Sequence, residues 1–205
     1  MPVEVLVSDL GNVILPLVFA RRADALQRLC AFDADNAVEE PTLILQSVHD
    51  RLEFGIGGCS REEFFRQASA TLNLDLSYAD FSREYSDIFQ EDPATVEILR
   101  RARVRHKFLL SNTDAIHWDW ILGNYAPHLD FFERLLTSHE LQALKPDATI
   151  YRKVEALTGL PPAAHLLIDD LTANVEGARA CGWDGIVHTD AATLEAQLRE
   201  RNLLP

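Results

Sequence analysis

The strongest constraint on the fold is a set of short segments that are apolar at nearly every position. The strand candidates are residues 3–8, 107–111, 134–137, 165–168 and 185–188. A strand with one face in water alternates apolar and polar residues, whereas a strand covered by helices on both faces does not. Segments with helical periodicity separate these candidates. The pattern therefore predicts an α/β fold of three layers, with a parallel sheet between two layers of helices.

The helical segments that follow the later strand candidates have recognisable ends. They span residues 93–103, 114–123, 147–158, 172–180 and 191–201. Thr172, for example, is a candidate N-cap for a helix that closes at Gly182, and Asp147 is a candidate cap for its own helix.

Residues 16–90 contain no convincing strand and read as four helices. Ser60 with Glu63 forms a capping-box pattern, and Ser77 can cap the helix after it. We therefore predict a core of residues 1–15 and 91–205, and an all-helical cap of residues 16–90 inserted after the first strand. Such helices would cover the carboxyl ends of the strands, where open α/β sheets bind ligands.

Charge and hydropathy limit the partners that the protein can have. The formal net charge is −13, and a nucleic-acid surface would need clustered Lys and Arg instead. No apolar run reaches the roughly 18 to 20 residues that cross a membrane, and the N-terminus lacks the pattern of a secretory signal. We expect a cytoplasmic protein without nucleic-acid or membrane partners. The sequence leaves its oligomeric state open.

Polar residues follow three of the strand candidates directly. They are Asp9, then Ser111, Asn112 and Thr113, and then Asp169 and Asp170, with Lys145 just ahead of a helix. Each residue alone is an ordinary cap or turn former. Parallel strands, however, bring all of these segments to one edge of the sheet. Carboxylates crowded there repel one another unless a cation binds them, and their hard oxygen atoms suit Mg²⁺.

Four motifs occur in the order VEVLVSDLGNVI, FLLSNT, the lysine of LKPDATIY, and LLIDDLTANVEGARACGW. In this order they resemble the haloacid dehalogenase (HAD) superfamily, whose core is Rossmann-like. The insertion looks like the helical cap of that superfamily, and RLEFGIGGCSREEFF is similar to a segment common in such caps. Within the superfamily, the motifs most resemble the small sugar-phosphate phosphatases, a group that includes α-D-glucose-1-phosphate phosphatase.

The resemblance implies a magnesium-dependent phosphatase in which Asp9 is the nucleophile. Asp9 would form an aspartyl-phosphate that water then hydrolyses. The resemblance also implies that Asp9, the backbone carbonyl of Gly11 and Asp170 hold Mg²⁺, with Asp169 a second ligand or a ligand through water. A sharp exit of the strand through Gly11 would let the backbone approach the metal and the phosphate.

The same resemblance assigns the phosphate-binding groups. The Ser111 hydroxyl and the amide of Asn112 would bind the phosphoryl oxygens, and Lys145 would offset charge on the phosphate and on the nucleophile. A phosphate monoester, expected to be a sugar phosphate, would be the substrate. Asn174 is expected to orient the loop after Asp169 rather than to touch substrate.

Gly11 departs from the superfamily pattern, because most of its phosphatases have there a second aspartate that acts as general acid and base. One account is a leaving group that needs little protonation, or a proton supplied by water or a cap residue. A second is a 2-haloacid dehalogenase, which would need no metal and would use Arg21 or Arg22 to hold the substrate carboxylate. A third is a member without turnover that only binds a ligand.

Selectivity depends on side chains whose orientation the sequence does not show. The candidates in the cap are Phe19, Arg22, Arg51, Glu53 and Phe54. On the helix after FLLSNT, packing is expected for Trp118 and Trp120, while His117 is left open between packing and contact with substrate.

Overall fold

The sheet at the centre of the molecule is parallel throughout, as the apolar strand candidates predict. The computed structural model describes residues 2–18, 20–21 and 41–205. Its strands are β1 (Val5–Ser8), β2 (His106–Ser111), β3 (Arg134–Thr137), β4 (His165–Asp169) and β5 (Asp184–Val187), in the order β3-β2-β1-β4-β5. The chain winds outward from β1 to β3 and then returns to the other side of β1. The winding therefore reverses at β1, which is where such sheets form a ligand crevice.

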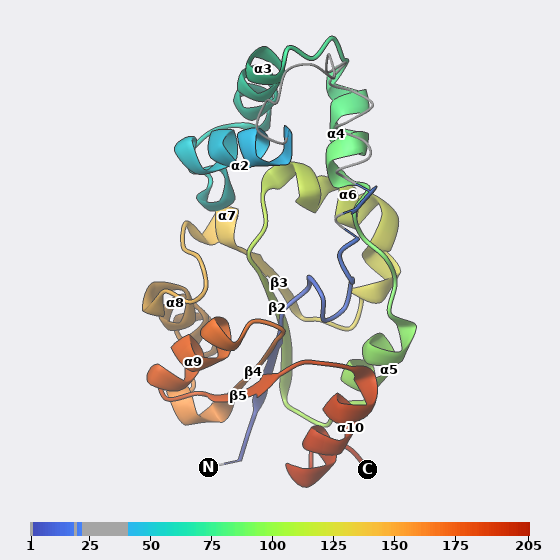
Figure 1. Ribbon diagram of the computed structural model, residues 1–205. Helices are drawn as coiled ribbons and strands as arrows, with labels where there is room; N and C mark the ends of the chain where they lie inside the picture. The colour runs from blue at the N-terminus through green and yellow to red at the C-terminus, as the bar shows by residue number, and fades with distance from the viewer. Residues whose placement is uncertain (1, 19, 22–40) are drawn as a thin grey trace.

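Helices cover both faces of this sheet, so the predicted three-layer α/β fold is confirmed (Figure 1). One face carries α5 (Pro93–Arg101), α6 (Ala115–Tyr125) and α10 (Ala191–Glu200), and the other carries α8 (Ala148–Thr158) and α9 (Thr172–Ala180). Short elements lie between them: η2 (Ala126–His128), α7 (Ser138–Leu141) and η3 (Pro162–Ala164).

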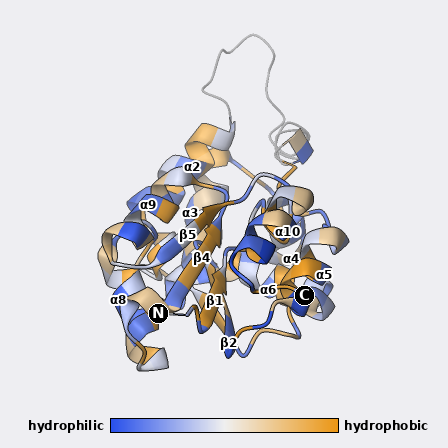
Figure 2. Ribbon diagram, turned by 90° about the horizontal axis from the view of Figure 1, so that it is seen from below, coloured by the Kyte–Doolittle hydropathy of each residue, from blue (hydrophilic) through white to orange (hydrophobic). Residues whose placement is uncertain are grey.

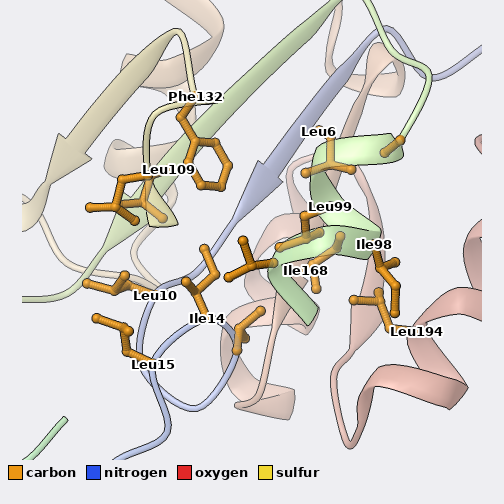
Figure 3. Close-up of a cluster of buried hydrophobic side chains, with 14 of the residues drawn as sticks. Leu6, Leu10, Ile14, Leu15, Ile98, Leu99, Leu109, Phe132, Ile168 and Leu194 are labelled. Atoms are coloured by element: carbon orange, nitrogen blue, oxygen red, sulfur yellow. The ribbon is translucent and has the colours of Figure 1, made fainter. Parts of the chain in front are cut away.

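Alternate residues of a strand enter different cores, which explains why apolar residues occupy successive positions of β1 and β4 (Figure 2). Leu6 and Leu109 pack with α5, α6 and α10, in the cluster drawn in Figure 3. Val7 and Leu110 point the other way and pack against α8 and α9. Because both faces are buried, a one-residue slip of a strand would exchange the side chains of the two cores.

The start of α9 corrects one expectation. Thr172 is the first helical residue and not the cap, which is Leu171, and no side chain of the cap residue bonds to the helix. The Asp169 carboxylate accepts the Leu171 N–H instead. Asp147 caps α8 as predicted, through the Thr149 N–H.

A group of helices lies beyond the carboxyl ends of the strands (Figure 1). These are α2 (Pro41–Arg51), η1 (Phe54–Ile56), α3 (Arg61–Leu72) and α4 (Tyr78–Ser86). They have an aromatic core of their own, in which the rings of Phe54 and Phe64 stack 4.3 Å apart. The predicted caps are present, since Ser60 accepts the Glu63 N–H and Ser77 accepts the Asp80 N–H.

Two chain segments run side by side between these helices and the sheet. Leu17 forms an antiparallel bridge with Phe89, and the Val18 N–H donates to the Ile88 carbonyl at 2.7 Å. Arg61 of α3 also forms an ion pair with Asp119 of α6.

The division into core and cap, with its boundaries after residues 15 and 90, stays a prediction. Within the described ranges, none of the helices has the length and apolarity needed to cross a membrane.

Candidate active site

Three carboxylates meet where two neighbouring strands end. Asp9 follows β1, Asp169 ends β4, and Asp170 is the next residue. One oxygen of each lies within 4.8 Å of the others. The parallel pairing of β1 with β4 brings these residues together, as the motif positions predicted.

Lys145 is buried among these acids. Its Nζ lies 2.8 Å from Asp9 Oδ1 and 2.7 Å from Asp169 Oδ2, and it donates to the Leu110 carbonyl at 2.8 Å. The ammonium group therefore uses its three donors on three acceptors. Its side chain has no exposed surface, so this charge is compensated by protein groups alone.

Burial raises the pKa of Asp9 to about 6, with Lys145 opposing the rise and Asp169 adding to it. Burial lowers the pKa of Lys145, but the charges of Asp9 and Asp169 outweigh it, and the net result is a raised pKa. Lys145 is therefore a cation at neutral pH. One lysine cannot neutralise three carboxylates, so the site keeps a negative charge that a metal ion would offset.

Asp169 and Asp170 have different surroundings. Asp169 Oδ1 accepts from the Leu171 N–H and from Asn174 Nδ2, both at 2.9 Å, and its Oδ2 faces Lys145. The orienting contact expected of Asn174 is thus present. Asp170 is half-buried and lines the cavity described below. Asp170 and Asp9 therefore offer the more accessible oxygens, and this hard, anionic set fits Mg²⁺.

The Asn112 side chain positions the segment that carries Lys145. Its Nδ2 donates to the Lys145 carbonyl at 2.8 Å, and its Oδ1 accepts the Lys145 N–H at 2.9 Å. These two bonds occupy the side-chain amide, so of the groups of Asn112 only the backbone N–H could take the phosphate-binding role expected of this residue. Ser111 is buried at the end of β2 and lines the cavity.

The segment holding Lys145 also touches α9 closely. Gly177 of α9 faces Pro146, and a Cβ at position 177 would lie 2.7 Å from the Pro146 carbonyl oxygen. Such a distance is shorter than van der Waals contact allows. The absence of a side chain at Gly177 therefore sets how near α9 comes to the residue after Lys145.

The turn after Asp9 does not require the conformational freedom of a glycine at Gly11. Its φ is not in the left-handed region, and a Cβ there would meet Leu17 at an ordinary 3.4 Å. The left-handed residue is Asn12, with φ 54°. Asparagine tolerates this conformation because its short side chain bonds locally. Here its Oδ1 accepts the Leu17 N–H and its Nδ2 donates to Asp170 Oδ2, both at 3.0 Å.

A cavity of about 460 Å³ connects the acidic cluster with the helices above it. Asp9, Ser111 and Asp170 form its base. The upper helices contribute Gln46, His49, Gly55 and Tyr85, and the apolar wall is formed by Leu17, Ile88, Phe89, Ile121, Leu144 and Leu171. Among the described residues that line it there is no Lys or Arg.

A buried polar cluster lies in one wall of this cavity. Asp114 accepts from Tyr85 Oη at 2.8 Å, from His117 Nδ1 at 2.7 Å, and from two backbone N–H groups of α6. Burial opposes ionisation of Asp114, but the charge and hydrogen bonds of His117 and Tyr85 hold its pKa well below the usual range.

The packing expected of Trp118 and Trp120 is confirmed, since both contact the large core cluster.

The cap candidates that the structure describes do not line the cavity. Phe54 is buried in the aromatic core, and Arg51 and Glu53 are exposed. Phe19 and Arg22 lie outside the described residues. Sequence reasoning missed Gln46 and His49, which are three residues apart on α2 and so share a face beside buried Leu45 and Val48. The signal in the sequence that could have indicated them is their position next to the apolar residues of α2, at the border of its buried face.

The raised pKa of Asp9 predicts that magnesium binding weakens in acid. Because the pKa of Asp9 is about 6, its carboxyl holds a proton below that pH, and a metal must displace this proton. The apparent affinity for Mg²⁺ should therefore fall about tenfold for each pH unit below about 6, and change little between about pH 7 and 8. Titrating Mg²⁺ against the melting temperature at several pH values measures this. An affinity that does not change down to about pH 5 would contradict a role for Asp9 in metal binding.

No protein-family model matches the chain. Among curated proteins, the D-ribitol-5-phosphate phosphatase of Bacteroides thetaiotaomicron is 24% identical over 188 residues. This match covers 87% of the present chain and 88% of the phosphatase. The similarity therefore extends over core and predicted cap alike.

Solved structures share the whole fold. A HAD-family enzyme from Bacteroides thetaiotaomicron matches with a TM-score of 0.83 and 23% identity, over 95% of this chain and 98% of that one. The wild-type form of that enzyme has also been solved with magnesium and inorganic phosphate. An L-2-haloacid dehalogenase from Xanthobacter autotrophicus matches with a TM-score of 0.62 and 19% identity, over 99% of this chain and 85% of that one. The fold alone thus does not separate the two activities.

Proposed function

We infer that this chain, a hydrolase of the HAD superfamily by its fold and its phosphatase relative, is a Mg²⁺-dependent phosphatase of small phosphate monoesters. One observation carries the proposal. Asp9, at the base of the cavity, lies 2.8 Å from buried Lys145 and beside the carboxylates of Asp169 and Asp170. A nucleophile, a cation and a metal-ligand set are the parts that phosphoryl transfer requires.

The residues divide the work as follows. Asp9 attacks phosphorus, and an aspartyl-phosphate forms as the bond to the leaving oxygen breaks. Lys145 stabilises the charge of the phosphoryl oxygens, which also accept from the Ser111 hydroxyl and the Asn112 backbone N–H. Asp9, Asp170 and the Gly11 carbonyl would hold Mg²⁺, with Asp169 acting through water. Bound there, the ion supplies charge compensation for the phosphate and the nucleophile.

The cavity supports a small ester with a single phosphate group as substrate. Its volume of about 460 Å³ suits a sugar or sugar-alcohol phosphate. No Lys or Arg among the described wall residues would bind a second phosphate or a carboxylate on the leaving group. D-Ribitol 5-phosphate, on which the curated relative acts, is therefore our first candidate, and α-D-glucose 1-phosphate is the second.

The dehalogenase alternative is less well supported. It needs an arginine for the substrate carboxylate, but Arg21 bonds to the Phe89 carbonyl and lies 3.9 Å from Asp87. Arg22 lies outside the described residues. Asp170 beside the nucleophile would repel a free carboxylate and has a use only when a cation is bound. A non-catalytic member would equally leave this charged cluster without a purpose.

The test is a steady-state assay of the purified protein with p-nitrophenyl phosphate, D-ribitol 5-phosphate and α-D-glucose 1-phosphate. We expect phosphate release from at least one sugar ester, and loss of that release when EDTA removes Mg²⁺. Restoring Mg²⁺ should restore the rate. Release of chloride from 2-chloropropionate in EDTA would instead favour the dehalogenase. A substrate that raises the melting temperature but is recovered unchanged would indicate a binding protein.

A further inference from the structure

We propose that His49, on α2 above the cavity, gives a proton to the leaving oxygen and later takes one from the attacking water. This inference rests on the proposed phosphatase function. It answers the question raised by Gly11, where the superfamily pattern would place the acid.

His49 lines the same cavity as Asp9, and its ring is held in place. Phe54 and Phe64 contact it edge-on, with centroids 5.8 and 6.0 Å from that of the imidazole. Gly55 leaves space for the ring, because a Cβ there would lie 3.1 Å from His49 Cε1. The side chain is 23% exposed, so it is accessible from the cavity while its orientation is restricted.

The other titratable groups in the upper wall are engaged. Tyr85 Oη donates to Asp114. His117 has Asp114 at 2.7 Å from Nδ1 and the Tyr85 carbonyl at 3.2 Å from Nε2. Since both of these partners are acceptors, both nitrogens of His117 act as donors. Neither residue therefore has a proton to spare for a substrate without breaking this cluster.

His49 differs from both. Its Nδ1 lies 3.3 Å from Asp50 Oδ1, so a proton on Nδ1 can donate to that carboxylate. Its Nε2 is 3.7 Å from Asp114 Oδ2, beyond hydrogen-bonding distance. Within the described chain, Nε2 is thus the titratable nitrogen of the cavity wall that makes no hydrogen bond. The Asp50 contact fixes which nitrogen serves the substrate.

The proton balance is complete without another reactant. With His49 protonated at both nitrogens, Asp9 forms its bond to phosphorus, and the electron pair of the breaking P–O bond goes to the leaving oxygen. That oxygen takes the Nε2 proton and departs as an alcohol. Water then attacks the phosphorus of the aspartyl-phosphate and gives a proton to Nε2. The P–O bond to Asp9 breaks, its electron pair returns to the carboxylate, and phosphate leaves.

Leaving groups of different acidity test this role. An alkyl ester such as D-ribitol 5-phosphate needs protonation, whereas p-nitrophenolate leaves unprotonated. His49→Ala should therefore lower kcat for D-ribitol 5-phosphate, or for whichever sugar ester the wild type hydrolyses, by about 10²-fold or more. In a single-turnover assay that follows p-nitrophenolate release, the first step with p-nitrophenyl phosphate should change less than about threefold. Added imidazole should restore part of the lost rate with the alkyl ester.

His106→Gln is the matched control, because His106 begins β2 at the opposite end of the strand and pairs with Glu133. His49→Gln keeps a polar side chain on α2 and should show the same split between esters as His49→Ala. Equal losses on both esters in both variants, without rescue by imidazole, would overturn the proposal and leave the phosphatase function intact. A wild-type protein inactive on every ester would overturn the function itself.

Discussion

Asp9→Asn should reduce kcat for every phosphate ester by about 10⁵-fold or more, which is on the order of losses seen when a covalent nucleophile is removed. The amide is uncharged and a poor nucleophile, so no aspartyl-phosphate can form. Its volume is nearly that of the carboxylate, so the turn after β1 should keep its shape. The expected loss thus comes from chemistry and not from unfolding.

Stability measurements separate these two causes. Asp9 is one of three crowded carboxylates, and removing its charge relieves repulsion from Asp169. Without Mg²⁺, the melting temperature of Asp9→Asn should therefore not fall much below that of the wild type. Asp75→Asn, an exposed site in the predicted cap, is the control for the same chemical change. A well-folded Asp9→Asn protein that keeps a tenth of the wild-type rate would exclude Asp9 as the nucleophile.

Lys145→Met should cause the largest loss of stability. The substitution keeps much of the side-chain volume but removes the ammonium group that lies 2.8 Å from Asp9 and 2.7 Å from Asp169. Breaking a buried ion pair by removing one partner costs about 3–5 kcal/mol, because the remaining charge is left without a partner. We expect a loss of that size in the free energy of unfolding, and loss of turnover, since the phosphate no longer meets a lysine.

Urea unfolding with and without Mg²⁺ measures the effect. Mg²⁺ binds the same acids, so it should stabilise Lys145→Met more than it stabilises the wild type. Lys153→Met provides the control, because Lys153 is on α8 and bonds only to the Leu141 carbonyl among the described contacts. A Lys145→Met protein as stable as the wild type at neutral pH would mean that the acids are not charged together.

The sheet and the base of the site follow from local sequence. The strands are predictable because burial on both faces makes most of their positions apolar, and Asp9 and Asp169 are predictable because each comes at a strand end. No other contact has to be known for this step. Lys145 does not follow a strand, so its place beside these acids is predicted only from the motif that contains it. The loop that carries it has no helical or strand periodicity from which its position could be derived.

The remaining features depend on tertiary contacts that one sequence does not display. Asn112 looks like a phosphate ligand in the motif, but its side chain is used by the backbone of Lys145, 33 positions away in the chain. Thr172 looks like a cap, but the Asp169 carboxylate takes the N–H ahead of it. His49 is noticed only when α2 is placed over the cavity. For Asn112 and His49, a segment distant in sequence decides what the side chain can do.

Gly177, a residue without a side chain, also affects the site through a contact distant in sequence. Its contact with Pro146 fixes the distance between the backbone that follows the acids and the backbone that follows the lysine. The position of the Lys145 segment relative to Asp169 is therefore held in part by a main-chain contact. A methyl group at Gly177, which does not line the cavity, would displace the segment that carries Lys145 and so behave as an active-site substitution.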